Sequence, residues 1–329
     1  MKTIAAKIPG IFITFLIAVP AWLAGQRIPV VGAPILGIVF GMCLAGLKRP
    51  GMLEEGIKFT SQRILQYSII LLGFGMNLFQ VFHTGKETLL LLCFTLTTTF
   101  LTAYLAGRLL KLDRNTNILI GVGSAICGGS AIAATAPVIG AREEEIAQSI
   151  STIFFFNVIA AFLFPAIGHL LGMNDHLFGL WAGTAINDTS SVVAAGYTYS
   201  ESAGNLAVVV KLTRTLMIIP VTIVLALLQS GQQGKGAVGR RVFSVFPWFV
   251  IGFLLASVAV TFFPLPEALC EGLTKGGKFF VAMAMAGIGL NTNIGKLLKN
   301  GSRSILLGLI CWLSLAIVSL GVQYLLLTL

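Results

Sequence analysis

The sequence predicts an all-α integral membrane protein with about ten or eleven transmembrane helices, two of them broken or re-entrant. Three observations indicate this fold class. Hydrophobic residues make up 56% of the 329 residues and charged residues only 10%, whereas a soluble domain carries about 25% charged residues. Apolar runs of about 20 residues, long enough to cross a bilayer, recur along the whole chain. Two of these runs also contain glycines and polar residues that interrupt membrane helices.

The apolar runs give the predicted spans in order and leave no room for a separate soluble domain. We therefore treat residues 1–329 as a single transmembrane transporter domain. The first apolar run resembles a signal peptide but lacks a clean small-residue cleavage site, so we expect it to be kept as a helix. The predicted spans are residues 8–25, 29–47, 59–82, 87–107, 116–140, 146–172, 175–199, 203–228, 241–263, 272–295 and 303–328.

The positions of Lys and Arg predict the orientation of these spans. If the N-terminus is cytoplasmic, most basic residues fall in cytoplasmic loops, which is the usual bias of membrane proteins. We therefore expect the N-terminus in the cytoplasm and the C-terminus outside. The cytoplasmic loops then hold Lys48, Arg49, Lys58, Arg108, Lys111, Arg114, Lys235, Arg240, Arg241, Lys296, Lys299 and Arg303, and the outer loops hold Arg27, Lys86 and Arg142.

The composition also excludes several classes of function. A net charge of +10 would suggest a nucleic-acid partner for a soluble protein. Here the orientation of the spans accounts for the charge, so we expect no nucleic acid. The five cysteines and three histidines show no metal-ligand spacing, and the motifs of common hydrolases and nucleotide-binding enzymes are missing. We expect no enzymatic activity, no metal and no cofactor.

Two pairs of segments within the chain have similar sequences, which we call internal echoes. The sequence GSAI at 123–126 matches GTAI at 183–186, at an offset of 60 residues, and GFGMN at 73–77 matches GIGLN at 287–291. Internal echoes are typical of transporters built from inverted repeats. We place the predicted repeats at residues 29–172 and 173–328. One pair of echoes lies inside the other, which does not fit a simple tandem duplication.

The segments at 121–140 and 183–196 do not have the sequence of ordinary spans. The first contains CGGS at 127–130, and two adjacent glycines weaken a helix and free backbone groups that must be satisfied inside the membrane. We expect both segments to be interrupted near mid-membrane and to lie close together, either as crossing helices or as re-entrant hairpins. The alternative is two uninterrupted helices whose small residues permit close packing.

Three charged residues lie within apolar segments and are candidates for chemistry. Asp188 is the only acidic residue placed deep in such a segment, and a charge there needs a cavity or a partner. Lys211 and Arg214 are three residues apart and share one face of the following helix. We expect both to face the breaks, with at least one in ion-pair reach of Asp188. The alternative is that both side chains extend to the membrane surface.

The charges near the breaks predict a site for a small anion. Two cations and one carboxylate leave one positive charge uncompensated, and half-helix N-termini add free N–H groups and a positive dipole end. Asp188 would balance a cation and act as the coupling residue by changing its protonation. The predicted substrate-binding residues are Ser124, Cys127, Gly128, Gly129, Ser130, Asn187, Asp188, Thr189, Ser190, Lys211 and Arg214.

Four motifs resemble those of the bacterial YeiH-type family, whose members are regarded as sulfate exporters. They are GFGMNL, GVGSAICGGSAIAATAPVI with REEE after it, GTAINDTSSVVAAG, and GIGLNTNI, and the resemblance covers nearly the whole chain. It implies a multi-pass protein of the bacterial cytoplasmic membrane. It also implies a fold similar to the inverted-repeat transporters that include bile-acid symporters and cation–proton antiporters. The Asn187–Asp188 pair resembles the ion-carrying pair of those antiporters, although that pair does not normally lie inside a broken helix.

The main hypothesis is a secondary transporter of a small anion, either sulfate, a related sulfur oxyanion or an organic anion, with coupling to protons or Na⁺. One alternative is a cation–proton antiporter that works through Asp188. A non-transporting membrane sensor is another, but no soluble output domain supports it. The partners that we expect are the anion and membrane lipid, and the sequence leaves a homodimer open.

Overall fold

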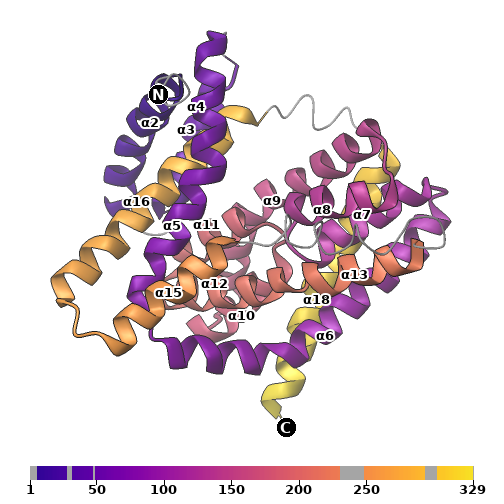
Figure 1. The fold of residues 1–329 in the computed structure, drawn as a ribbon. Helices are drawn as coiled ribbons and strands as arrows, with labels where there is room; N and C mark the ends of the chain where they lie inside the picture. Colours follow the sequence, from indigo (N-terminus) through magenta and orange to yellow (C-terminus); the bar gives the residue numbers. More distant parts are fainter. Residues whose placement is uncertain (1–5, 28–31, 47–48, 230–247, 293–301, 329) are drawn as a thin grey trace.

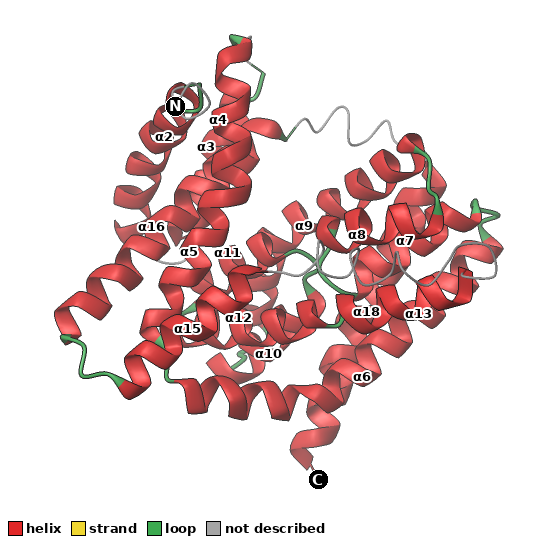
Figure 2. Cartoon of the chain, in the orientation of Figure 1, coloured by secondary structure: helices red, strands yellow, loops and turns green. Residues whose placement is uncertain are grey.

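The computed structural model describes residues 6–27, 32–46, 49–229, 248–292 and 302–328. Every regular element within these residues is a helix, as Figure 2 shows. Five of the helices are long and apolar enough to cross a membrane, which confirms the predicted all-α membrane fold. Some predicted features lie outside the described residues, namely parts of the spans 29–47, 241–263 and 272–295, and the loop cations Lys48, Lys235, Arg240, Arg241, Lys296 and Lys299.

Helices from the two ends of the chain form a first bundle, on the left in Figure 1. Its helices α3 and α16 lie against each other because Gly41 and Gly289 let their backbones approach closely. A Cβ atom built on Gly41 would lie only 3.0 Å from the Cα atom of Gly289. The first bundle consists of α2 (Ile8–Arg27), α3 (Gly32–Leu44), η1 (Gly51–Leu53), α4 (Glu54–Phe59), η2 (Thr60–Ile64), α5 (Leu65–Leu72), η3 (Gly73–Gly75), α15 (Trp248–Phe262) and α16 (Glu267–Asn291).

The middle of the chain and its last helix form a second bundle, which extends to the right in Figure 1. Helix α12 packs against both α10 and α11 in this bundle, and α11 also contacts α3 and α16 of the first bundle. Helix α11 therefore lies where the two bundles meet. The second bundle consists of α6 (Leu78–Leu109), α7 (Arg114–Ala125), α8 (Gly129–Ile139), α9 (Glu143–Leu170), α10 (Asp175–Ala185), α11 (Thr189–Tyr199), α12 (Glu201–Leu216), α13 (Ile218–Gln229) and α18 (Ser302–Thr328).

Both segments that the sequence predicts to be broken are interrupted. The predicted span 116–140 divides into α7 and α8, which are separated by residues 126–128. Gly128 has a φ of +69° and a ψ of −129°, a conformation that is open essentially to glycine alone. The predicted span 175–199 divides into α10 and α11, where Ile186 and Asp188 are extended. Continuous small-residue helices are therefore excluded at both places.

The predicted boundary between the spans 59–82 and 87–107 is wrong. Helix α5 ends at Leu72 and a short 3₁₀ turn follows, after which α6 runs without a break from Leu78 to Leu109. Asn77 sets the start of α6, because its side-chain oxygen accepts a hydrogen bond from the backbone nitrogen of Phe79 at 2.8 Å. Lys86, which was expected in an outer loop, lies inside this helix.

The order of elements differs between the two predicted repeats. In residues 29–172 the broken pair α7–α8 precedes the final helix, whereas in residues 173–328 the broken pair α10–α11 comes first. The two halves therefore do not have their broken and continuous helices in the same order along the chain. The repeat boundaries and their inverted relation stay a prediction.

Candidate functional site

The two breaks lie next to each other and are joined by one lysine. The ammonium of Lys211 donates a hydrogen bond to the carbonyl of Ile126 at 3.0 Å and another to the carbonyl of Ile186 at 2.8 Å. These carbonyls belong to the first residues after α7 and α10. The Lys211 side chain is fully buried, so it cannot extend to the membrane surface. The predicted proximity of the two breaks is confirmed.

Arg214 binds the same two half-helices one turn further along α12. Its Nε donates to the carbonyl of Ala125 at 2.6 Å, and its two terminal nitrogens donate to the carbonyls of Ser124 and Thr184. The last carbonyls of a helix have no partner within the helix and form the negative end of its dipole. Lys211 and Arg214 therefore satisfy and neutralise the C-terminal ends of both α7 and α10.

The expected ion pair between Asp188 and one of these cations is not present. No ion pair in the described part of the chain includes Asp188. The carboxylate instead caps α11, accepting from the backbone nitrogens of Ser190 at 3.0 Å and Ser191 at 3.4 Å and from the Ser190 hydroxyl. The reason is that Lys211 and Arg214 are occupied by carbonyls, while the N-terminus of α11 offers the carboxylate free N–H groups.

Asn157 on α9 holds the second break in place. Its side-chain oxygen accepts a hydrogen bond from the backbone nitrogen of Asp188 at 3.2 Å. A Cβ atom built on Gly128 would lie 3.5 Å from both the side-chain nitrogen of Asn157 and the Cβ of Asp188. Residues from α9 and from both breaks therefore meet at one point. The sequence signal for Asn157, an amide within an apolar span, is too common to have identified it.

A cavity of about 570 Å³ lies between the two bundles, in front of the N-termini of α8 and α11. The second bundle contributes the first residues of these two half-helices and part of α9. The first bundle contributes the π-helical turn η2, the start of α5 and single residues of α15 and α16. The polar residues of the lining are Ser61, Gln62, Arg63, Gln66, Ser130, Asn157, Asp188, Thr189 and Ser190.

The structure divides the predicted substrate-binding residues into two groups. Gly129, Ser130, Asp188, Thr189 and Ser190 line the cavity. The other six predicted residues do not line the cavity. They lie where the C-termini of α7 and α10 meet α12, a place we call the crossing: Ser124, Cys127, Gly128, Asn187, Lys211 and Arg214.

Two residues of the crossing keep polar atoms without a partner. The Ser124 hydroxyl and both side-chain atoms of Asn187 are buried and have no hydrogen-bond partner among the described residues. Cys127 is a buried part of an apolar cluster. Lys211 and Arg214 donate to backbone carbonyls and do not line the cavity, so their expected contact with an anion stays a prediction.

Sequence reasoning missed the contribution of η2 to the cavity. Ser61, Gln62 and Arg63 lie on this π-helical turn, and π-turns inside helices are often found at functional sites. The only sequence signal was the polar run SQR at 61–63 inside a predicted span. Arg63 donates to the side-chain oxygen of Gln66 at 3.3 Å and takes part in no ion pair within the described ranges.

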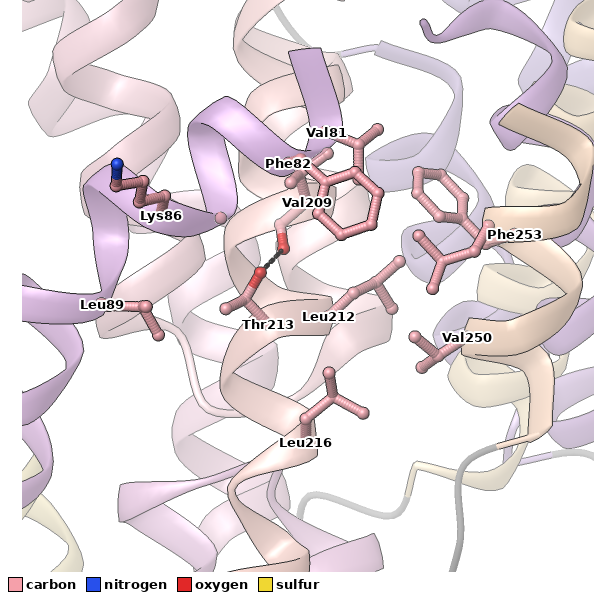
Figure 3. Close-up of a pocket in the computed structure, with 12 residues that line it drawn as sticks. Val81, Phe82, Lys86, Leu89, Val209, Leu212, Thr213, Leu216, Val250 and Phe253 are labelled. Atoms are coloured by element: carbon pink, nitrogen blue, oxygen red, sulfur yellow. Dashed lines mark hydrogen bonds between the residues drawn. The ribbon is translucent and has the colours of Figure 1, made fainter. Parts of the chain in front are cut away.

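A second cavity, shown in Figure 3, is unsuited to a polar ligand. It has a volume of about 290 Å³ and lies between α6, α12 and α15. Its lining is apolar apart from Thr213 and Lys86, and the Thr213 hydroxyl already donates to the carbonyl of Val209 at 2.9 Å. A third cavity, of about 260 Å³, lies between α2, α3, α16 and the adjoining ends of α11 and α12. The cavity in front of α8 and α11 is the largest of these three and contains the residues of both breaks, so it is the candidate site. Among the described residues, no group of three or more His, Cys, Asp or Glu side chains is placed to hold a metal ion.

Comparison with known proteins gives one consistent family. The family model described as "Conserved hypothetical protein 698" matches residues 9–308. A UPF0324 membrane protein of Streptococcus agalactiae is 47% identical over 326 residues, covering 96% of this chain and 97% of that protein. The UPF0324 membrane protein of Streptococcus mutans is 48% identical, with 97% of each chain covered. One from Fusobacterium nucleatum is 43% identical, covering 96% of this chain and 97% of its own.

Proposed function

This chain belongs to the UPF0324 family of bacterial multi-pass membrane proteins, and we propose that it is a secondary transporter of a small anion. The observation that carries the proposal is the cavity between the two bundles, onto which the N-termini of the half-helices α8 and α11 open. Sites of secondary transporters typically lie at discontinuous helices, between parts of the protein that move against each other.

The arrangement of the half-helices supports an anionic substrate. Lys211 and Arg214 neutralise the negative C-terminal ends of α7 and α10 behind the cavity. The positive N-terminal ends of α8 and α11 are the ends that face the cavity. Helix N-termini present free N–H groups and a positive dipole end, which favour anions. Arg63 adds a full positive charge to the lining from the opposite bundle.

The sulfate exporter resemblance makes a sulfur oxyanion our first choice of substrate. Sulfate and its relatives accept hydrogen bonds on all their oxygens, which suits a lining of hydroxyl, amide and guanidinium donors. Asp188 is the proposed coupling residue, because it is the acidic side chain in this lining and protonation would change the charge of the cavity. We propose that the protein lies in the bacterial cytoplasmic membrane with its N-terminus inside and its C-terminus outside.

The test is a flux measurement with purified protein in liposomes. Uptake of radiolabelled sulfate, sulfite and a small panel of organic anions is measured with and without a pH gradient or a Na⁺ gradient. We expect saturable exchange of at least one sulfur oxyanion. Empty liposomes and liposomes with an unrelated membrane protein are the controls. Absence of anion flux and of anion binding across the panel would contradict the proposal.

Cation–proton antiport is the second candidate, and one observation favours it. Asp188 provides a carboxylate in the cavity without an ion-pair partner among the described residues, and a carboxylate can carry a cation and a proton in turn. The antiporter would show proton movement driven by Na⁺ or K⁺ in the complete absence of a transportable anion. A fluorescent pH indicator inside the same liposomes separates the two functions.

A further inference from the structure

The two half-helices that open onto the cavity begin in different ways. Helix α11 begins after Asp188, whose carboxylate accepts from the first free backbone nitrogens of the helix. Helix α8 begins after Gly128, and no side chain caps it. Gly129 and Ser130, the first residues of α8, both line the cavity. One positive helix end thus has an anionic partner built into the chain, whereas the other faces the cavity without one.

Several further donors face the cavity without a partner. The Thr189 side chain is part of a residue only 8% exposed, and its hydroxyl makes no hydrogen bond within the described residues. Asn157 is 3% exposed; its oxygen is used by Asp188, but its side-chain nitrogen donates to no described group. Neither donor atom is among the fully buried polar atoms without a partner, so both remain accessible from the cavity. Unused donors on two neighbouring elements therefore point to a ligand that accepts hydrogen bonds.

The opposite wall supplies the charge for such a ligand. Arg63 lies on η2 of the first bundle and lines the same cavity as Gly129 and Thr189. Its single described bond, to the neutral side chain of Gln66 at 3.3 Å, leaves most of its donors and its full charge available. A guanidinium binds oxyanions through paired N–H groups, which makes arginine well suited to this role.

From these contacts we infer that a compact oxyanion binds at the uncapped N-terminus of α8, held by Thr189 and Asn157 and paired with Arg63 across the cavity. The inference rests on the proposed transport function and names the binding residues and ligand class for it. Each of these groups can donate a hydrogen bond, which suits a ligand with acceptors on several sides, as sulfate, thiosulfate or sulfite has. Asp188 occupies the equivalent place at α11, so we expect one anion to bind in this cavity.

The position of this subsite gives the anion a mechanical role. Arg63 belongs to the first bundle, while Gly129, Asn157 and Thr189 belong to the second. A bound oxyanion would bridge the two bundles with charge-assisted hydrogen bonds, which an empty cavity cannot supply. Differential binding to the closed arrangement is what a substrate needs in order to shift a conformational equilibrium.

The first test removes the arginine charge. Equilibrium binding of radiolabelled sulfate and sulfite is measured on the full-length protein in lipid nanodiscs, for Arg63→Gln, Arg63→Lys and the control Arg108→Gln. Arg108 is exposed, bonds only to Tyr104 in the described structure and lies outside the cavity. We expect Arg63→Gln to weaken binding about tenfold or more, Arg63→Lys to weaken it less, and the control to leave it unchanged.

The second test gives α8 the internal anion that α11 already has. Ser130 is exposed to the cavity and its hydroxyl makes no bond in the described structure, so Ser130→Asp places a carboxylate in the first turn of α8, where it stabilises a helix. We expect this variant to fold as wild type and to lose sulfate binding. Ser130→Asn is the matched control, because asparagine has the size of aspartate but no charge, and we expect it to keep measurable sulfate binding where Ser130→Asp loses it.

The outcomes separate the two proposals. If wild type binds none of the anions, the proposed function and the inference both fail. If wild type binds an anion but Arg63→Gln and Ser130→Asp bind it as their controls do, the transport proposal stands and the inferred subsite is wrong. Thermal unfolding of each variant checks that lost binding does not come from lost folding.

Discussion

Asp188 combines a structural task with a chemical one. As the residue before α11 it caps the helix, and as a cavity residue it is proposed to gain and lose the coupling proton. These tasks can be separated by substitution, because asparagine is as good a helix cap as aspartate but carries no charge.

Asp188→Asn is therefore predicted to leave stability nearly unchanged and to abolish pH-driven transport. Anion binding should persist or become tighter, since a negative charge has left the cavity, and exchange of one anion for another should continue. Sulfate binding, anion exchange and pH-driven flux are measured side by side at matched protein levels. If cation–proton exchange is present in wild type and lost in the variant, with no anion binding in either, the antiporter function is the correct one.

Lys211 is predicted to contribute to stability rather than to substrate binding. Lys211→Met keeps the length of the side chain but leaves the carbonyls of Ile126 and Ile186 without their donor. Each buried carbonyl left unpaired costs about 1–3 kcal/mol. Thermal unfolding of purified protein should show a clear decrease in the melting temperature. Lys275→Met is the control, because that side chain is 72% exposed and its pairing with Glu271 is a surface contact; equal effects of the two variants would contradict the prediction.

At the scale of elements, the breaks depend on residues that end one half-helix and begin the next. In the first break Gly128 turns the chain with a positive φ, and in the second the extended residues Ile186 and Asp188 do so without glycine. At each break, the C-terminus of the first half-helix (α7 or α10) faces Lys211 and Arg214, and the N-terminus of the second (α8 or α11) faces the cavity. The same break thus separates the stabilising contacts from the binding surface.

Adjacent glycines in the first break allow a matched test. Gly128→Ala forces alanine into a backbone conformation that costs about 1–3 kcal/mol, although space for the methyl group is available. Gly129 is helical, and a Cβ atom there would meet nothing within 4 Å. We predict a lower melting temperature for Gly128→Ala and an unchanged one for Gly129→Ala. The same melting temperature in both variants would show that the strain argument is wrong.

At the scale of the whole molecule, an ion pair joins the bundles near the opposite end of α11 from the cavity. Lys278 on α16 contacts Glu201 at the start of α12 at 2.7 Å, and its ammonium lies 5.6 Å from the ring centre of Tyr197. Thr189 at the other end of α11 faces the cavity. The bundles are therefore joined by an ion pair beside one end of this helix, where a smaller cavity of about 260 Å³ also lies, and the larger cavity lies at the other end.

For the proposed transport, we expect alternating access to separate the bundles at this ion pair, so cross-linking it should stop transport. With Lys278→Cys and Glu201→Cys joined by a short thiol reagent, we predict loss of flux, retention of anion binding and recovery on cleavage of the linker. Lys275→Cys with Glu271→Cys is the matched control, because that pair lies within α16 and does not join the bundles. Single-cysteine variants control for the five native cysteines. Unimpaired flux in the cross-linked protein would exclude separation of the bundles at this point.

The sequence alone determined the features that depend on local composition. Apolar runs predicted the helices, and the glycines and polar residues at 127–130 and 187–190 predicted both breaks. The partners of Lys211 and Arg214 were predicted only in part, and the place of Arg63 in the cavity was not predicted at all. These depend on which segments meet in space: the carbonyl of Ile126 lies 85 residues from Lys211 in the chain. The tertiary structure decided that the cations satisfy half-helix carbonyls, because unpaired backbone groups inside a membrane bind the nearest strong donor.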